Sequence, residues 1–241
     1  MQTKELTVSQ MVRENYRTAD VFKKYGINYC CGGAMDLDTA CLMRGIDRSV
    51  IEAELKAARS VVLLPQGLPF QTWKPAFLVD YLLHIHHAYL TQTLPQLGVQ
   101  LAGFTDGHKR KLPQFVEILE KFERLSTVLS EQMRYEEDVV FPYIRQLEHT
   151  TARREPYGSL FVRTLKKPLT TTENSGGQLA LLDELKKAAD NYQFPSNACT
   201  NHRVLFHRLK ELDEGCRFHF QLEQQFLFPK ALEMETCLLN L

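Results

Sequence analysis

The residues best suited to chemistry in this chain are polar side chains that interrupt apolar helical stripes in its C-terminal two thirds. Near the C-terminus, positions spaced alternately three and four apart read Leu205, Leu209, Leu212, Cys216, His219, Glu223 and Phe226. A helix with this period buries the whole stripe, so His219 and Glu223 are expected to face inward. Because residues four apart lie one above the other on a helix, the two side chains can hold the same ion.

Two earlier segments carry the same pattern. Their stripes read Phe115, Ile118, Phe122, Leu125, Leu129, Gln132, Glu136 and Val139 in one, and Leu83, His87, Leu90, Leu94, Leu97 and Leu101 in the other. An unpaired carboxylate in a helical core is costly, whereas a metal ion neutralises its charge and uses its lone pairs. The three stripes together therefore predict a metal site. Its expected ligands are His87, Glu136, His219 and Glu223, with Gln132 as a weaker candidate.

An internal repeat supports this site. The segments QMRYEEDVVFP and HFQLEQQFLFP match at a glutamate and at a Phe-Pro pair five residues later, so Glu136 corresponds to Glu223 at a separation of 87 residues. Two helices with the same device favour two carboxylates that converge on one centre, as in carboxylate-bridged bundles. The alternatives are a core histidine with one hydrogen bond, and an inward glutamate paired with Arg134 or Arg217. The other histidines are expected at the surface or behind the ligands.

The order of the segments predicts an all-α chain with two domains. Residues 1–60 consist of short helical segments, and residues 61–74, which are rich in Pro and Gly, form a linker. Residues 75–241 form an up-down four-helix bundle. The expected helices of this bundle are 75–103, 111–148, 177–192 and 195–235.

Composition and charge narrow the class of protein. The chain has 241 residues, 44% of them hydrophobic, and its formal net charge is +0, which gives no electrostatic reason to expect nucleic acid or a membrane as partner. No apolar run approaches the roughly 20 residues of a membrane helix, and the polar N-terminus lacks the apolar core of a signal peptide. Six irregularly spaced cysteines do not suggest a disulfide framework, and Cys216 and Cys237 are expected to be buried helix residues. These features predict a cytoplasmic protein.

A vicinal cysteine pair forms a second candidate site. Cys30 and Cys31 precede two glycines in the segment CCGG, which is expected to be a loop. Adjacent cysteines rarely bond to each other, so the pair is a candidate for redox exchange, metal transfer or an intermolecular bridge. The alternative is two small residues in a turn.

At these residues the chain resembles the iron–sulfur cluster repair (RIC) family of the YtfE and ScdA type. The segment TADVFKKYGINYCCGG is similar to the short N-terminal domain of that family. The segments LVDYLLHIHHAYL, EEDVVFPYI and FHFQLEQQFLFPKAL are similar to its hemerythrin-like domain. The resemblance covers nearly the whole chain and implies a four-helix bundle that holds a non-haem di-iron centre with four histidines and two bridging glutamates.

Carried over by position, the resemblance implies an asymmetric site. His87 and His219 match two of the family's histidines, and Glu136 and Glu223 match its bridging carboxylates. Glutamine stands at 132 where the second helix of the family supplies a histidine, and Asn174 in TTENSGG best matches the position of the fourth. In the family both missing histidines serve one iron. We therefore expect one well-bound metal and a second position that is weak or empty, since amide oxygens bind Fe(II) less well than imidazole does.

The resemblance implies a role in repairing iron–sulfur clusters damaged by nitric oxide or oxidants during stress. Damaged iron–sulfur proteins would be the partners, and Cys30 and Cys31 would serve transfer, redox chemistry or docking. A hemerythrin-like sensor or store of O2, NO or iron is an alternative, as is a metal-free relative that acts as an interaction protein. Zinc and manganese are alternatives to iron. A homodimer is possible, and the sequence does not decide whether the protein is an enzyme.

Overall fold

The computed structural model describes residues 5–30, 33–60, 67–153, 162–163 and 175–240. It confirms the all-α fold: in these ranges the regular elements are helices, and the only extended pairing is an isolated bridge between Thr7 and Asp36. The chain divides into two compact units, Met1–Gln66 with Tyr192–Leu209, and Gly67–Asn191 with Lys210–Leu241. None of the described helices combines the length and apolarity needed to cross a membrane.

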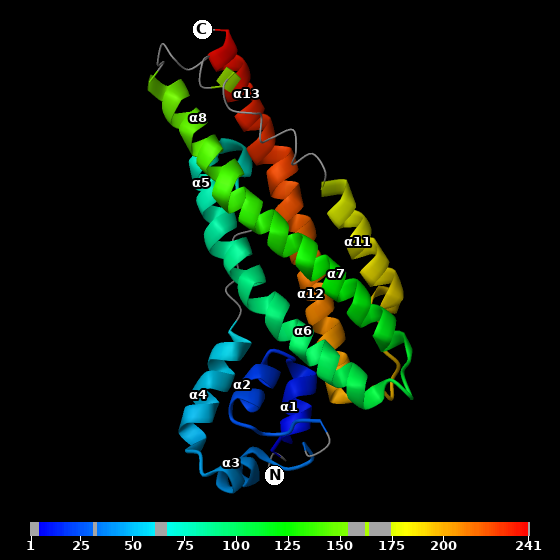
Figure 1. The fold of residues 1–241 in the computed structure, drawn as a ribbon. Coiled ribbons are helices and arrows are strands. Elements are labelled where there is room, and N and C mark those ends of the chain that lie inside the picture. Colours follow the sequence, from blue (N-terminus) through cyan, green and yellow to red (C-terminus); the bar gives the residue numbers. More distant parts are fainter. Residues whose placement is uncertain (1–4, 31–32, 61–66, 154–161, 164–174, 241) are drawn as a thin grey trace. The chain divides into compact units, whose positions relative to one another are not determined.

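The first unit contains four short helices at the N-terminal end (Figure 1). They are α1 (Val8–Glu14), α2 (Thr18–Lys24), α3 (Leu37–Arg44) and α4 (Arg48–Arg59). Side-chain caps begin three of them: Thr7 forms a capping box with Gln10 at α1, Asp36 accepts the Thr39 N–H at α3, and Asp47 accepts the Ser49 N–H at α4. These caps satisfy backbone N–H groups that have no partner within the helix.

The first unit also includes residues 192–209, which the sequence pattern predicts to be part of the bundle. The reason is packing by the first turns of helix α12 (Thr200–Leu222). Val204 is buried in the same apolar cluster as Val8, Phe22 and Ile51. The hydroxyl groups of Ser9 and Thr200 also lie 3.0 Å apart in a hydrogen bond. A short N-terminal segment thus completes its core with residues that lie far away in the sequence.

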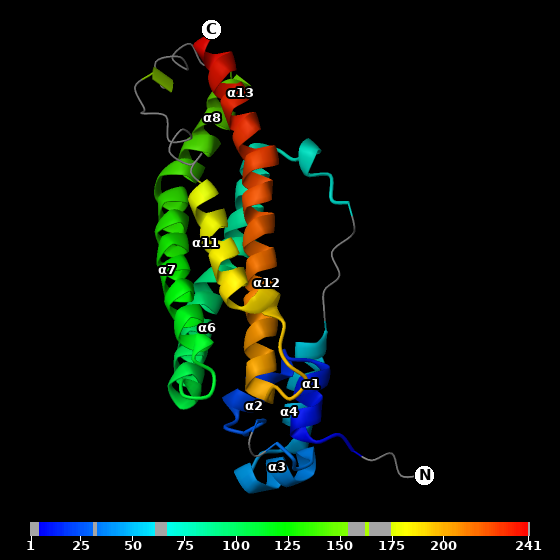
Figure 2. The same ribbon diagram turned by 90° about the vertical axis from the view of Figure 1, so that its right-hand side faces the viewer.

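The second unit is the predicted helical bundle. Its first long helix joins α5 (Pro75–Tyr81), η2 (Leu82–His87) and α6 (Ala88–His108), and its second joins α7 (Gln114–Tyr135), η3 (Glu136–Val140) and α8 (Phe141–Arg153). The third is α11 (Ser175–Ala188), and the fourth continues from α12 through η5 (Glu223–Leu227) into α13 (Phe228–Leu239). Figures 1 and 2 show α6, α7, α11 and α12 side by side.

Helix ends differ from the predicted ones around residue 190. The third helix ends at Ala188 because Asp190, Asn191 and Tyr192 all have positive φ angles, which a right-handed helix cannot contain. The fourth helix begins at Thr200 and not at Pro195. Cys216 is buried as expected, but the prediction for Cys237 was wrong, because this residue lies off the buried face of α13 and is exposed.

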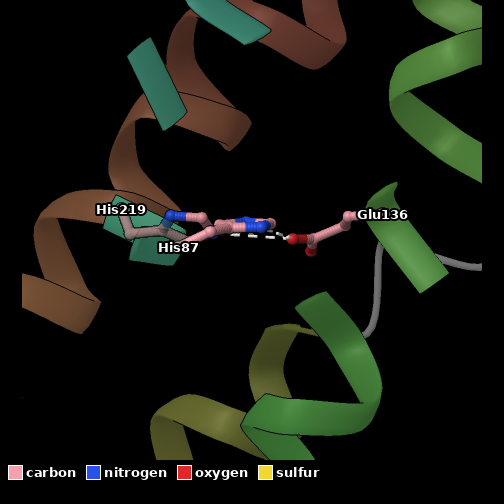
Figure 3. Close-up of side chains that lie close together, drawn as sticks. All are labelled: His87, Glu136 and His219. Carbon is pink, nitrogen blue, oxygen red and sulfur yellow. Dashed lines mark ion pairs between the residues drawn. The ribbon is translucent and has the colours of Figure 1, made fainter. Parts of the chain in front are cut away.

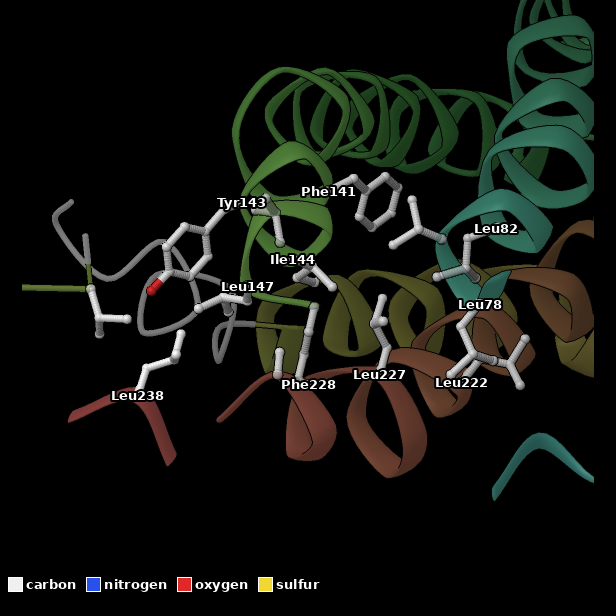
Figure 4. Packing of buried hydrophobic residues seen from close by; sticks show 14 residues of the cluster. Leu78, Leu82, Phe141, Tyr143, Ile144, Leu147, Leu222, Leu227, Phe228 and Leu238 are labelled. Carbon is white, nitrogen blue, oxygen red and sulfur yellow. The ribbon is translucent and has the colours of Figure 1, made fainter. Parts of the chain in front are cut away.

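One end of the bundle is closed by a compact apolar cluster (Figure 4). It joins side chains from α5, α8, η5 and α13, including Leu78, Phe141, Ile144, Leu227 and Leu238. Removing such side chains from water is the main favourable term in folding. The cluster holds together the helices that carry the candidate ligands.

Three of the long helices widen into a π-helical turn, η2, η3 and η5, and each turn contains or begins with a candidate ligand. In η3 the Phe141 N–H bonds to the Glu136 carbonyl five residues earlier, and in η5 the Phe228 N–H bonds to the Glu223 carbonyl. Each of these phenylalanines precedes a proline, which has no N–H and whose ring clashes with the carbonyl four residues earlier. The wider turn accommodates the proline, and this explains the repeated Phe-Pro pair.

The π-helical turns also shift the inward stripe. The helical period predicts Val139 as the next inward residue after Glu136, but Val139 is 38% exposed and Val140 is 0% exposed. The buried residue after Glu223 is likewise Leu227 and not Phe226. A π-helical turn takes up one extra residue, so the stripe resumes one position later.

Candidate metal centre

The four side chains predicted as ligands are all buried in the bundle. The exposed fraction is 2% for His87, 0% for Glu136, 3% for His219 and 1% for Glu223. His87, Glu136 and Glu223 belong to π-helical turns, which are frequent at functional sites, and His219 lies one helical turn before η5. The inward orientation that the periodicity predicted is therefore present on all three helices.

Three of these residues converge on one point (Figure 3). His87 Nε2 lies 3.1 Å from Glu136 Oε2, and His219 Nε2 lies 3.7 Å from the same oxygen. One ligand atom from each of the three residues falls within 4.8 Å of the others. Glu223 borders this cluster, with its Oε2 at 3.5 Å from His219 Nε2.

The donor set fits a metal ion. Ligand atoms about 2.1 Å from one ion lie roughly 3–3.5 Å apart, close to the separations around Glu136 Oε2. Several atoms of the cluster are buried and have no hydrogen-bond partner among the described residues: His87 Nε2, Glu136 Oε2, His219 Nδ1 and Glu223 Oε1. Buried polar atoms are normally paired, and a cation between them would use their lone pairs. Imidazole and carboxylate together suit iron, manganese and zinc.

The charges of the side chains also allow a cation. Burial raises the pKa of Glu136, but its contacts with His219 and His87 outweigh burial and lower that pKa to about 2. Burial lowers the pKa of His219, yet the charges of Glu223 and Glu136 raise it to about 10. Burial and the charge of Glu136 raise the pKa of Glu223 to about 7. By themselves the side chains thus hold a proton on His219 between carboxylates, and a metal ion can replace that proton.

Arginine does not pair with the buried glutamates in the part of the chain that the structure describes. Arg217 pairs instead with Asp213, at 3.0 Å, and with Asp183, at 2.6 Å. The described ion-pair partners of Glu136 and Glu223 are histidines. The alternative in which an arginine neutralises an inward glutamate therefore has no support among these residues.

Gln132 contacts the cluster as a hydrogen-bond donor. Its Nε2 donates to Glu136 Oε1 at 2.5 Å, one helical turn away. A histidine at this position would instead direct a nitrogen lone pair toward a metal. The role of Gln132 as a ligand stays a prediction, as does that of Asn174, which lies outside the described residues.

Two neighbours of the cluster were missed by the periodicity. Glu137 Oε1 lies 2.8 Å from His87 Nδ1, although one step from Glu136 along an α-helix should carry it off the inward face. His86 is half-buried, and its ring lies 5.5 Å from the ring of His219 between centroids. Burial lowers the pKa of His86 to about 4, so it stays neutral near pH 7. His86 lies beside the three-residue cluster and does not belong to it.

The second candidate site is described only in part. Cys30 is half-buried and is a free thiol, and its backbone N–H donates to Asn28 Oδ1 at 2.9 Å. This bond forms a tight turn before the glycines. Cys31 lies outside the described residues. The role of the vicinal pair in redox exchange, metal transfer or an intermolecular bridge therefore stays a prediction.

The fold and the cluster define a helical-bundle protein with a buried centre of two histidines and neighbouring carboxylates. A family described as ScdA_N, a domain of unknown function (DUF542), matches residues 4–59. The chain is 30% identical over 224 residues to the iron-sulfur cluster repair protein YtfE of Escherichia coli O157:H7, covering 91% of this chain and 93% of that protein. It is 27% identical to the protein of the same name from Enterobacter sp. (strain 638), over 98% of this chain and 100% of the relative.

This likeness extends over both units. The chain therefore belongs to the family of the iron-sulfur cluster repair protein YtfE.

Proposed function

We propose that this chain is a cytoplasmic non-haem iron protein that takes part in repairing iron–sulfur clusters damaged by nitrosative or oxidative stress. The observation that carries the proposal is the convergence of His87 Nε2 and His219 Nε2 on Glu136 Oε2, all in a buried position. The relatives are named iron-sulfur cluster repair proteins, and these names support the proposed role in repair. Damaged iron–sulfur proteins are the proposed partners.

In this proposal the bundle is hemerythrin-like, and His87, Glu136 and His219 hold the iron, with Glu223 as a further ligand or bridge. Iron held there would bind NO or O2, or would supply iron to a damaged cluster. The chain's own contribution is to keep water away from the centre and to orient the ligands. His87 Nδ1 contacts Glu137, and Glu136 accepts a hydrogen bond from the amide of Gln132.

The proposed site is asymmetric and holds one firmly bound iron. Gln132 directs its amide nitrogen to Glu136, and its amide oxygen is a weaker ligand for Fe(II) than imidazole. The second position would then depend on weaker oxygen ligands or water. The described part of the chain has no other histidine in the three-residue cluster that would replace the missing ones.

Cys30 and Cys31 are the proposed residues for redox exchange, metal transfer or docking of a damaged protein. Replacing both by serine should lower repair of an NO-inactivated iron–sulfur enzyme and leave the iron content of the bundle unchanged. Full repair by this double variant would favour a sensor or store of O2, NO or iron that uses the bundle alone.

The first test is elemental analysis of protein purified anaerobically from iron-replete cells, together with repair of an NO-inactivated iron–sulfur enzyme. About one iron per chain and measurable repair support the proposal. About two would show that Gln132 or other groups complete a di-iron centre. No iron after reconstitution with Fe(II) would overturn the iron site and leave an interaction protein.

A further inference from the structure

The two histidines of the cluster differ on their outer sides. His87 Nε2 faces Glu136, and its other ring nitrogen, Nδ1, lies 2.8 Å from Glu137 Oε1. His219 Nε2 also faces Glu136, but its Nδ1 is buried with no hydrogen-bond partner among the described residues. Of the two imidazoles, only His87 is therefore held from both sides.

The contact with Glu137 sets where the ring of His87 carries its proton. A carboxylate can only accept, so Nδ1 must be the donor in this hydrogen bond. Nε2 is then free to direct its lone pair at a cation between His87 and Glu136. A ligand histidine whose other N–H is bonded to a carboxylate is fixed in tautomer and orientation, and its basicity rises.

Glu137 is placed to do this without being part of the core. Its side chain is 46% exposed, while that of His87 is 2% exposed. It lines a surface groove of about 430 Å³ together with Thr91, Ser130 and Arg134. The carboxylate thus reaches from solvent to the outer edge of a buried ring. Replacing it removes one hydrogen bond and leaves no large cavity.

The π-helical turn explains how Glu136 and Glu137 can both contact one ring. On a regular α-helix, consecutive residues point about 100° apart. Glu136 and Glu137 open the turn η3, where the backbone is wider. His87 ends the turn η2 on the facing helix, and its ring lies between the two carboxylates.

We propose that Glu137 is a positioning residue of the metal centre, which holds His87 in the Nδ1–H tautomer so that Nε2 can bind metal. This inference rests on the proposed metal site but goes beyond its ligands. In this proposal a carboxylate fixes the orientation of His87, whereas no described side chain does the same for His219. The two histidines of the centre would therefore differ in how firmly they are held.

The test compares Glu137→Ala and Glu137→Gln with the wild type. Affinities for Fe(II), measured anaerobically, and for Zn(II) are expected to fall about 10- to 100-fold in Glu137→Ala. Glu137→Gln keeps an acceptor oxygen and should recover part of that loss. Asp138→Asn is the matched control, because it removes the same charge from the next, exposed position and should leave both affinities unchanged.

The second readout is the tautomer of His87, followed by nitrogen NMR of the imidazole in protein without added metal and in the Zn(II) form. The wild type and Glu137→Gln should show a protonated Nδ1 with slow exchange, and Glu137→Ala should lose the slow exchange. Unchanged metal affinity and an unchanged His87 spectrum in Glu137→Ala would overturn the proposal. If the wild type binds neither metal, the proposed function fails, while the spectra of the metal-free proteins still decide whether Glu137 holds His87.

Discussion

Among the described residues, the bundle buries glutamates in two places, and the two places are built differently. At the closed end, Glu235 is 4% exposed and accepts a hydrogen bond from the Tyr143 hydroxyl at 2.5 Å. In the candidate metal centre, Glu136 contacts His87 and His219, and Glu223 contacts His219 alone. One oxygen of each of these glutamates has no hydrogen-bond partner among the described residues. No atom of Tyr143 or Glu235 belongs to that group of unpartnered atoms.

This difference shows that a buried carboxylate alone does not indicate a metal. A neutral phenol satisfies Glu235, and the pair has the character of a structural hydrogen bond. The centre around Glu136 instead brings together buried carboxylate oxygens and ring nitrogens that have no hydrogen-bond partner among the described residues, and a cation could use their lone pairs. Variants at the two kinds of site should therefore differ in whether they lose metal.

The largest effect is expected from Glu136→Ala. This change removes the oxygen that both histidines face, so metal content should fall to background. The loss in binding should be at least about 3 kcal/mol, comparable with removing one partner of a buried charge pair. Elemental analysis and Zn(II) titration measure it. Glu235→Gln is the control and should keep its metal; equal loss in both variants would contradict the distinction between the sites.

Metal affinity should rise with pH. The proton on His219, whose pKa is raised to about 10, competes with a metal for the ring. Raising the pH removes this competitor, so affinity should increase at least about tenfold per pH unit, or at least about 2.7 kcal/mol over two units, between about pH 6 and pH 8. Glu223, whose pKa is raised to about 7, also loses its proton in this range and would add to the increase. Calorimetry in two buffers of different ionisation enthalpy counts the protons released. Affinity that stays level across this range would show that no proton is displaced.

A stability effect without a metal effect is expected from Tyr143→Phe. Glu235 then loses the phenol that donates to it, and the free energy of unfolding should fall by about 1–3 kcal/mol. Urea unfolding measures the loss, and metal content should stay at the wild-type value. The double variant Tyr143→Phe/Glu235→Leu removes donor and acceptor together and should recover most of the stability. Loss of metal in the single variant would link the two sites.

The smallest effect is expected from Gln132→Leu. It removes the amide that donates to Glu136 and should weaken metal binding about tenfold, or about 1.4 kcal/mol, if Gln132 only orients the carboxylate. Gln146→Leu is the matched control, because it removes a similar amide bond, to Thr150, in the continuation of the same long helix. Complete loss of metal in Gln132→Leu would show that Gln132 itself is a ligand.

The helical period predicted which helices carry the candidate ligands, but not the register beyond them. His87, Glu136, His219 and Glu223 are buried as expected because a stripe of about 3.6-residue period faces the core. Val139 was placed inward and is exposed, because the period assumes a regular α-helix and η3 is a π-helical turn. The Phe-Pro pairs were visible in the sequence and mark two of the three wider turns.

The sequence by itself determined the all-α class, the inward position of the candidate ligands and, through its likeness to known relatives, the family. These properties depend on local period and residue type, which are read along the chain. Only the tertiary structure decided that Glu137 reaches His87 and that residues 192–209 complete the N-terminal core. Both depend on contacts between segments far apart in the sequence, where the position of each side chain is set by how whole helices pack.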